Sequence, residues 1–367
     1  MVDHHPRDAT VGGTPELEVV ARMDDRPGNP ALTPDGRLIV SLHPFPYYEP
    51  SPYHVVEVLE DGSTRPFPNE DWSTAPDEEE GVGLSAVIGV QSDRRGVVWI
   101  MDMGGGELPP KLVAWDTKRD ELHRIITIPP HAGRPGSFHQ DFAIDEVRGA
   151  IFIADLNVHG ALLGPSDPAI VAVDLKTGRV RRAHLGHHSL HPEEDVSLEI
   201  EGRPILVENP QGEAEEPKLG LDPIVIDPAN EWVYYGSIHG TSVYRVRAAD
   251  LLDEGLSPDA LGERVERYGE KAPCDGISID VAGNIYITDL GNNAIGVTTP
   301  DGGYQILVRD EERLLWPDGF SYGPDGYFYV TVNQLHRSAV LNAGQETSEP
   351  PFLVMRFRPL AASAIGR

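Results

Sequence analysis

The chain has 367 residues, of which 40% are hydrophobic and 24% are charged, so it is long and apolar enough to form a large core. Its 59 acidic residues outnumber 30 basic ones, which gives a formal net charge of −29 at pH 7. A surface of this sign repels nucleic acid and anionic membranes, which excludes both as expected partners. Only five of the basic residues are lysine. That composition fits either adaptation to high salt or a GC-rich genome that favours arginine.

The N-terminus and the cysteine content bear on where the protein works. Residues 1–13 lack the apolar core of a signal peptide, and the sequence has no run of 18 apolar residues that could span a membrane. Cys274 is the only cysteine, so the chain cannot form an internal disulfide. We expect a cytoplasmic monomer, although a secreted protein whose signal had been removed would have the same sequence.

One pattern recurs along the chain: a strand of alternating apolar residues, a tight turn, and a second apolar strand. It begins at residues 29, 87, 141, 222, 275 and 318, in the segments NPALTPDGRLIVSL, VIGVQSDRRGVVWIMD, DFAIDEVRGAIFIAD, DPIVIDPANEWVYYGS, DGISIDVAGNIYITD and DGFSYGPDGYFYVT. Each segment predicts a β-hairpin.

Most of these hairpins are followed by a third and a fourth strand, as in residues 111–128, 169–185 and 296–308. Four-stranded units repeating roughly every 45–60 residues are typical of a β-propeller. The sequence therefore predicts an all-β fold, a six-bladed β-propeller that forms a single domain over residues 1–367.

The ends of the chain and one long insertion complete this prediction. Residues 17–23 and 352–357 resemble strands, and pairing them in one blade would close the ring and remove a free sheet edge. Residues 187–218 form an insertion between blades three and four, with a possible hairpin that turns at Glu201-Gly202.

The first strand of each propeller blade lines the central channel, and counting back from each hairpin turn predicts which residues stand at its mouth. These positions are Gly28, Ile88, Asp141, Asp222, Asp275 and Asp318. Four carboxylates in one narrow, partly desolvated space need a countercharge. Since Ca²⁺ prefers oxygen ligands, it is the expected metal. The alternative is that the aspartates only accept backbone N–H groups that tie the blades together.

Other polar and aromatic residues are candidates for the same mouth. His43, His139 and His239 lie near strand ends, where each is either a general base or a structural histidine. In blade six, Asn333 is a candidate ligand contact, and Trp316 is expected to pack in the core rather than stack on a ligand.

Several of these segments resemble the major royal jelly/yellow protein family. They are VIGVQSDRRGVVWIMDMG and PPKLVAWD in blade two, SFHQDFAIDEVRGAIFIAD in blade three and WPDGFSYGPDGYFYVTVNQLHR in blade six. The likeness covers most of the chain, from about residue 25 to about residue 358. It implies a six-bladed propeller and a function as a small-molecule binder or in pigment chemistry, such as a tautomerase or isomerase acting on a catechol-like ring.

A more distant resemblance is to the gluconolactonase/regucalcin-like propellers, which are lactone hydrolases with a divalent metal at the channel mouth. Asp275 matches their metal-binding aspartate, and Asp222 stands where they have an asparagine. Gln140 lies near the position of a substrate-contacting asparagine, whereas Gly28 stands where they have a glutamate. Asp318 or a loop carboxylate would have to replace that glutamate.

These resemblances imply a metal-dependent hydrolase of small cyclic esters. The metal would polarise the lactone carbonyl, and Asp275 or Asp222 would activate the attacking water. The alternative is a protein of the yellow type that binds a small molecule in its channel without catalysis. The implied metal ligands are Asp275, Asp222, Asp141 and Asp318. Of the candidate substrate contacts, the resemblance implies Gln140, whereas His43, His139, His239 and Asn333 are candidates because of their places near the channel.

Overall fold

The computed structural model describes residues 14–76, 82–158, 162–163 and 166–367. Residues 1–13, on which the expectation of no signal peptide rests, lie outside the described residues. Within the described ranges, no helix is long and apolar enough to cross a membrane.

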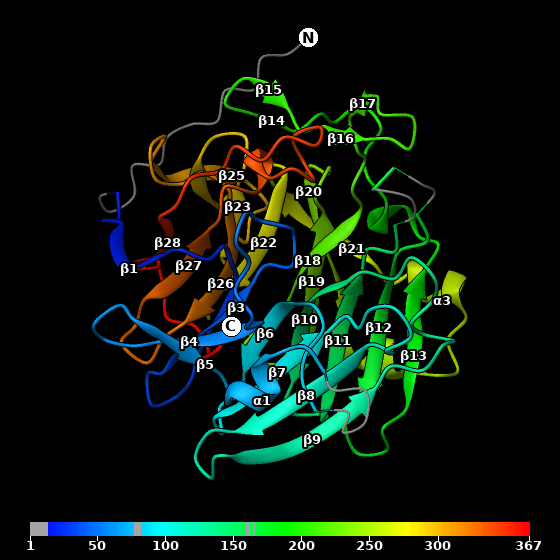
Figure 1. The fold of residues 1–367 in the computed structure, drawn as a ribbon. Coiled ribbons are helices and arrows are strands. Elements are labelled where there is room, and N and C mark those ends of the chain that lie inside the picture. Colours follow the sequence, from blue (N-terminus) through cyan, green and yellow to red (C-terminus); the bar gives the residue numbers. More distant parts are fainter. Residues whose placement is uncertain (1–13, 77–81, 159–161, 164–165) are drawn as a thin grey trace.

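Six four-stranded antiparallel sheets are arranged in a ring, which confirms the predicted six-bladed β-propeller (Figure 1). The innermost strands of blades one to six are β2 (Pro27–Leu32), β6 (Val87–Ser92), β10 (His139–Asp145), β18 (Leu221–Ile226), β22 (Cys274–Ile279) and β26 (Pro317–Tyr322). The second strands are β3 (Leu38–Leu42), β7 (Val97–Asp102), β11 (Ala150–Asp155), β19 (Trp232–Ser237), β23 (Ile285–Asp289) and β27 (Phe328–Val332). The third strands are β4 (Val55–Val58), β8 (Lys111–Asp116), β12 (Ala169–Asp174), β20 (Ser242–Arg247), β24 (Ala294–Thr298) and β28 (Phe352–Phe357). The outermost strands are β5 (Thr64–Pro66), β9 (Glu121–Thr127), β13 (Val180–Leu185), β21 (Glu266–Glu270), β25 (Tyr304–Arg309) and β1 (Glu18–Met23).

The ring closes through blade six, because β1 from the start of the chain pairs with β28 from its end. This is the predicted pairing of the two terminal strands. Because of this pairing, the first and last strands of the chain belong to one sheet, and neither strand is left unpaired. Each innermost strand contacts the innermost strands of both neighbouring blades, so the six strands surround the channel.

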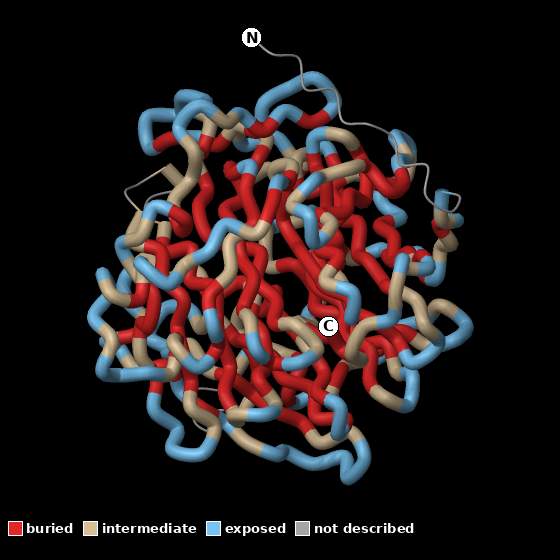
Figure 2. Tube along the Cα trace, turned by 180° about the vertical axis from the view of Figure 1, so that it is seen from behind, coloured by how far each residue is buried: buried red, intermediate tan, exposed pale blue. Residues whose placement is uncertain are grey.

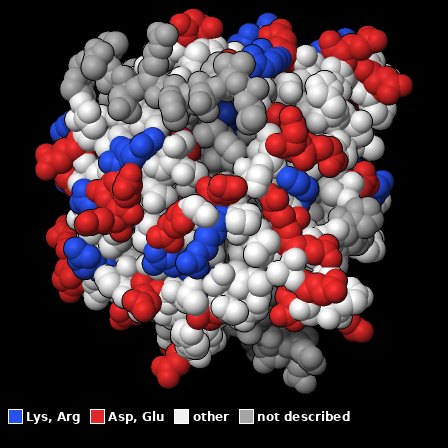
Figure 3. All heavy atoms as spheres, turned by 90° about the horizontal axis from the view of Figure 1, so that it is seen from above, with Lys and Arg blue, Asp and Glu red and all other residues white. Residues whose placement is uncertain are grey.

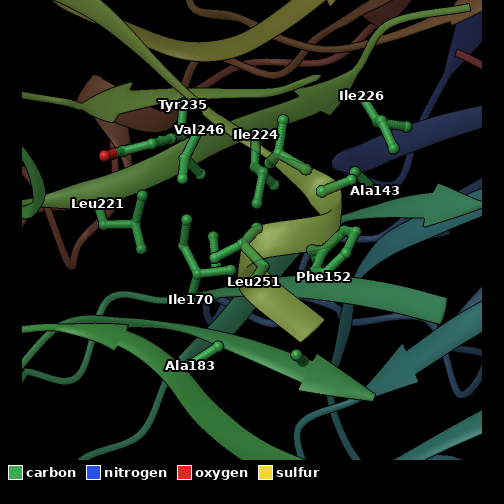
Figure 4. Close-up of a cluster of buried hydrophobic side chains, with 14 of the residues drawn as sticks. Ala143, Phe152, Ile170, Ala183, Leu221, Ile224, Ile226, Tyr235, Val246 and Leu251 are labelled. Carbon is green, nitrogen blue, oxygen red and sulfur yellow. The ribbon is translucent and has the colours of Figure 1, made fainter. Parts of the chain in front are cut away.

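The core lies between the blades. Most inner and middle strands are apolar on both faces because each sheet is sandwiched between two neighbours, as in Ile151–Ala154 of β11. One buried cluster fills each blade-to-blade interface. Figure 4 shows the cluster between blades three and four, where Phe152 and Ala143 face Ile224 and Ile226. Figure 2 shows the result, with buried strands inside and exposed loops around them.

The short elements lie outside the blades. They are α1 (Glu70–Ser73), α2 (Ala248–Leu252), α3 (Pro258–Gly262), η1 (His188–Leu190) and η2 (Leu335–Arg337). The insertion carries two small hairpins, formed by β14 (Glu199–Ile200), β15 (Arg203–Pro204), β16 (Val207–Glu208) and β17 (Ala214–Glu215). The first hairpin turns at Glu201-Gly202 as predicted, and both residues have positive φ. These hairpins lie at the top of Figure 1, at the end of the channel where the innermost strands begin.

Candidate active site at the channel mouth

All six innermost strands contain the same irregularity near the mouth. In each, the register with the second strand shifts by one residue after the first pair. In blade four, for example, Leu221 pairs with Ser237, but Ile224 pairs with Tyr235. Such a β-bulge adds a residue to one strand and re-aims its side chains. The second and third residues of every innermost strand lie in this bulge.

The position of one aspartate relative to the bulge differs from the prediction. The second residues of the six strands are Gly28, Ile88, Gln140, Asp222, Asp275 and Asp318. Gln140 therefore shares a level with three aspartates, and Asp141 lies one residue further along its strand. The prediction that four aspartates stand at one level was wrong, because it counted back from the hairpin turn, and the turn of blade three is one residue longer. In blade three Gly149 N donates to Asp145 O, four residues back, whereas in blade five Gly283 N donates to Asp280 O, three residues back.

Small residues at the third position let neighbouring blades approach closely. A Cβ on Gly276 would lie 2.2 Å from the backbone oxygen of Asp318, and one on Gly89 would lie 2.4 Å from that of Gln140. Neither distance is possible, so glycine is required at both positions. The close approach brings the polar side chains of adjacent blades together.

Asp222 and Asp275 form a pair of buried carboxyl groups that one amide bridges. Burial, and after it the charge of Asp275, holds the pKa of Asp222 well above its usual range, which favours its neutral form. The Gln140 amide donates to Asp222 Oδ2 at 2.8 Å and to Asp275 Oδ1 at 3.2 Å. The Trp316 indole N–H donates to Asp275 Oδ2 at 2.6 Å. Asp275 thus accepts hydrogen bonds from Gln140 and Trp316, which favour its ionised form.

The other two aspartates each have a carboxamide partner. Asn333 Nδ2 donates to Asp318, so the structure brings this predicted residue into the site. Asn29, which was not predicted, donates to Asp141. Both Asn29 and Asp141 line a cavity of about 20 Å³ further down the channel, with room for about one water molecule.

Burial raises the pKa values of all four aspartates. It raises that of Asp141 to about 7, with the charge of Asp275 as the second cause. The pKa values of Asp222 and Asp318 are well above the ordinary range, again from burial first and from the charges of Asp275 and Asp141 second. Burial raises the pKa of Asp275 as well, opposed by the hydrogen bonds from Trp316 and Gln140. Within the described residues, no cationic side chain is among the groups that shift the pKa values of these four aspartates.

The three predicted histidines are buried, and no hydrogen bond or ion pair in the described ranges joins them to the aspartates. The His43 Nδ1 accepts from the backbone N–H of Phe45 at 3.2 Å, and the His239 Nδ1 accepts from that of Leu219 at 3.1 Å. His139 Nε2 lies 4.0 Å from Asp155 Oδ2. Burial lowers the pKa values of all three, so they are neutral at pH 7. Their predicted role in substrate binding stays a prediction.

The mouth does not fit the metal site that the distant resemblance implies. Nowhere in the described ranges do three His, Cys, Asp or Glu side chains stand where they could hold a metal. The space of the missing first-blade glutamate is filled, because a Cβ on Gly28 would lie 2.6 Å from Ser41 Oγ. The Gln140 amide N–H group stands between Asp222 and Asp275, where a shared cation would have to lie. Of the polar residues named above at the mouth, within the part of the chain that the structure describes, Asn29 Oδ1 and Asp222 Oδ1 are the buried oxygens without a hydrogen-bond partner.

An apolar cap closes the mouth above these residues. Its buried members come from the insertion and from blades three to six: Leu156, Leu198, Ile200, Ile205, Val207, Leu219, Ile238, Leu290, Trp316, Leu335 and Leu341. Two backbone hydrogen bonds hold the insertion against blade six, from Leu206 N to Leu341 O at 3.0 Å and from Ala343 N to Leu206 O at 2.8 Å. The insertion therefore crosses the mouth, and the cap keeps Asp222, Asp275 and Asp318 at most 4% exposed.

Trp316 links the cap to the acid pair. Besides its bond to Asp275, its ring stacks on His336 with ring centroids 6.2 Å apart and planes 7° from parallel. His336 and Arg337 both pair with Glu201 at the turn of the insertion hairpin. The local sequence around Trp316 predicts packing alone, since nothing in its pattern indicates a polar contact.

The acidic character of the sequence extends over the outer surface of this end. Figure 3, which views the molecule from the side that carries the insertion, shows Asp and Glu around the whole face, with Lys and Arg scattered among them. On the described part of this face, the Lys and Arg side chains do not gather into one patch. That part therefore offers no continuous basic surface for nucleic acid.

Comparison with known proteins agrees with this architecture. A luciferin-regenerating enzyme is 12% identical, with a TM-score of 0.55, over 96% of this chain and 98% of that chain. A gluconolactonase from Xanthomonas campestris is 12% identical, with a TM-score of 0.57, over 97% and 96%. A calcium-binding regucalcin from Agrobacterium tumefaciens is 16% identical, with a TM-score of 0.51, over 96% and 95%. At these identities the likeness shows the fold alone.

Sequence comparison is more specific. The search of curated proteins gave no match. The family model of the major royal jelly proteins matches residues 85–347, which cover blades two to five and the two inner strands of blade six. The chain belongs to the major royal jelly protein family.

Proposed function

We propose that the channel mouth is the active site of a hydrolase of small cyclic esters. The buried pair of Asp222 and Asp275, held together by hydrogen bonds from the Gln140 amide to both carboxyl groups, carries this proposal. Two carboxyl groups whose environments separate their protonation states supply an acid and a base at the same pH. The structural likeness to a gluconolactonase supports the choice of a lactone as the substrate class.

The pair would act in two steps. Asp275, ionised, removes a proton from a water molecule as the water oxygen bonds to the lactone carbonyl carbon, while Asp222 gives its proton to the carbonyl oxygen. When the carbonyl re-forms, its proton returns to Asp222 and the ring C–O bond breaks. The leaving oxygen takes the proton held by Asp275, and a hydroxy acid is released. The capped mouth keeps bulk water away and strengthens each of these interactions.

A divalent metal has no place in this scheme, because the side chains present do not fit one. Regucalcin is a calcium-binding protein, so the role of a cation is included in the test. We propose that any cation effect on this protein is small unless Gln140 moves out of the pair.

The test is hydrolysis of a lactone panel followed by pH-stat, with Ca²⁺ and then with EDTA, for the wild type and Asp275→Asn. Turnover that survives EDTA but is lost in the variant supports the acid pair. Turnover lost in EDTA as well would restore the metal-dependent lactonase. No turnover in any arm would overturn the hydrolase and leave a small-molecule binder, a function that the closed cap over a buried polar site also suits.

A further inference from the structure

We propose that the substrate of this site is a lactone that carries an apolar substituent, rather than a polyhydroxylated sugar lactone. This inference rests on the proposed hydrolase function and adds the chemical class of the substrate. Two separate features of the mouth carry it: the apolar cap above the acid pair, and an apolar cleft beside that cap.

The cap gives the site a polar floor and an apolar roof. Below are the carboxyl groups of Asp222, Asp275 and Asp318 with their amide partners. Above are the side chains of the cap, which are aliphatic except for Trp316, and the Trp316 Nε1 donates to Asp275. A sugar lactone has hydroxyl groups around its whole ring, and those that faced the cap would lose their hydrogen bonds to water without replacement. A molecule with one polar edge and an apolar body matches both surfaces.

The cleft provides a place for that body. It has a volume of about 750 Å³ and lies over blades two and three, at the same end of the channel as the acid pair. Its walls include Phe45, Met103, Leu108 and Phe138 together with several proline and glycine residues. This volume is in the range of sites that hold drug-sized ligands.

The cleft has almost no polar side chain free for a ligand. Among its lining residues only Arg134 and Ser137 have polar side chains. Arg134 pairs with Asp167 at 2.5 Å, and Ser137 Oγ donates to Asp155 Oδ2 at 2.8 Å. Sugar hydroxyl groups would find few side-chain partners there, whereas an alkyl or aryl group would lose contact with water.

The cleft and the cap form one continuous apolar surface. Phe45 and Phe138 line the cleft and also pack against the cap cluster, which contains Trp316. Phe138 is only two residues before Gln140 on the way into β10. A substituent in the cleft would therefore extend from a lactone ring placed at the acid pair.

The experiment compares γ-lactones of increasing alkyl length with glucono-δ-lactone, in the wild type and two matched variants. Leu108→Ser removes an apolar wall of the cleft at a residue that is 41% exposed, so folding is little affected. Leu122→Ser removes a leucine of nearly equal exposure, 40%, from the outermost strand β9, away from the cleft. Binding of the same lactones is measured by equilibrium dialysis, which does not depend on turnover.

We expect kcat/KM to rise about three- to fourfold for each added methylene until the cleft is filled. Leu108→Ser should lower kcat/KM for the long lactones by about three- to tenfold, and Leu122→Ser should leave it unchanged. Faster hydrolysis of glucono-δ-lactone, or rates independent of chain length, would overturn the substrate class while the hydrolase stands. If no lactone is hydrolysed, the proposed function falls. Chain-length-dependent binding that Leu108→Ser weakens would then still support the cleft, and its absence would overturn it.

Discussion

The indole N–H of Trp316 donates a 2.6 Å hydrogen bond to Asp275 Oδ2 from a residue that is only 1% exposed. Trp316 also has a φ of +62°, a left-handed conformation that is costly for a bulky residue. Its surroundings hold it there through the stack on His336 and the packing of the cap. A strained residue that is fixed on one side and bonded to a carboxylate on the other is suited to position that carboxylate.

Replacing Trp316 by phenylalanine should therefore reduce both stability and activity. The loss of the N–H leaves a buried acceptor on Asp275 without its partner, which costs about 1–3 kcal/mol. We expect kcat to fall by at least about tenfold, because 1.4 kcal/mol of lost transition-state stabilisation corresponds to that factor. The measurements are urea denaturation and lactone kinetics. Trp99→Phe is the matched control, since Trp99 is also 1% exposed but its Nε1 has no partner in the structure. Equal effects of the two substitutions would show that Trp316 only packs.

The raised pKa of Asp141 predicts that the protein loses stability as pH rises. Its pKa is about 7 in the folded state and near 3.8 in the unfolded chain, so between these values the folded state holds a proton that the unfolded state has lost. The contribution of this group is complete below pH 3.8 and is lost as pH rises through 7. The thermal midpoint of the wild type should fall from pH 5 to pH 8, and that of Asp141→Asn should fall less. Asp61→Asn, at a fully exposed position, should keep the wild-type slope, and identical slopes in all three proteins would contradict the assignment.

Gln140→Glu should create the cation site that the wild type lacks. The substitution puts a carboxylate between Asp222 and Asp275 in place of the amide that donates to both. Without a cation the variant should be less stable than the wild type at pH 8, because another buried charge is added. With Ca²⁺ at 100 times its dissociation constant the variant should gain about 2.7 kcal/mol. Thermal unfolding with and without Ca²⁺ measures both effects. A wild type that gains as much from Ca²⁺ as the variant would show that the native mouth already binds the cation.

Glu201 should hold the insertion over the mouth. Its carboxylate pairs with Arg337 at 2.6 Å and with His336 at 3.0 Å, but Glu201 is 39% exposed in its side chain, so the net contribution is at most about 1 kcal/mol. Glu201→Gln should speed amide exchange in residues 198–207 by up to about fivefold. Glu199→Gln is the control, because Glu199 is an exposed glutamate of the same hairpin. Exchange that is equally fast in both variants would mean that the pairing does not restrain the insertion.

The sequence analysis predicted the architecture because hairpin turns and alternating apolar residues are local features. The six inner hairpins, the pairing of β1 with β28 and the turn at Glu201-Gly202 all follow from patterns within short segments. The bulge in the innermost strands does not follow from a pattern within a short segment. It depends on how closely neighbouring blades approach, which no single strand reveals.

One signal could have found the correct level of the site. Gly89, Gly276 and Gly319 all occupy the third position of their strands, where a Cβ would collide with an atom of the next blade. These glycines align blades two, five and six. In blade three, matching the apolar residues Phe142 and Ile144 to Ile277 and Ile279 of blade five places Gln140 beside the aspartates and Asp141 one residue further on. The contact between Trp316 and Asp275 had no such signal, because the two residues are 41 positions apart and meet only in the folded ring.

The most direct test of the acid pair is a pH titration of its carboxyl groups. The titration is monitored by NMR of protein labelled with ¹³C at the aspartate carboxyl carbons. Asp222→Asn and Asp275→Asn assign the two signals. We predict that the pair keeps one proton at pH 7, carried by Asp222, and that removing the partner in Asp275→Asn changes the titration of Asp222. Two signals that titrate independently near pH 4 would contradict a shared proton, and with it the acid and base roles assigned to Asp222 and Asp275.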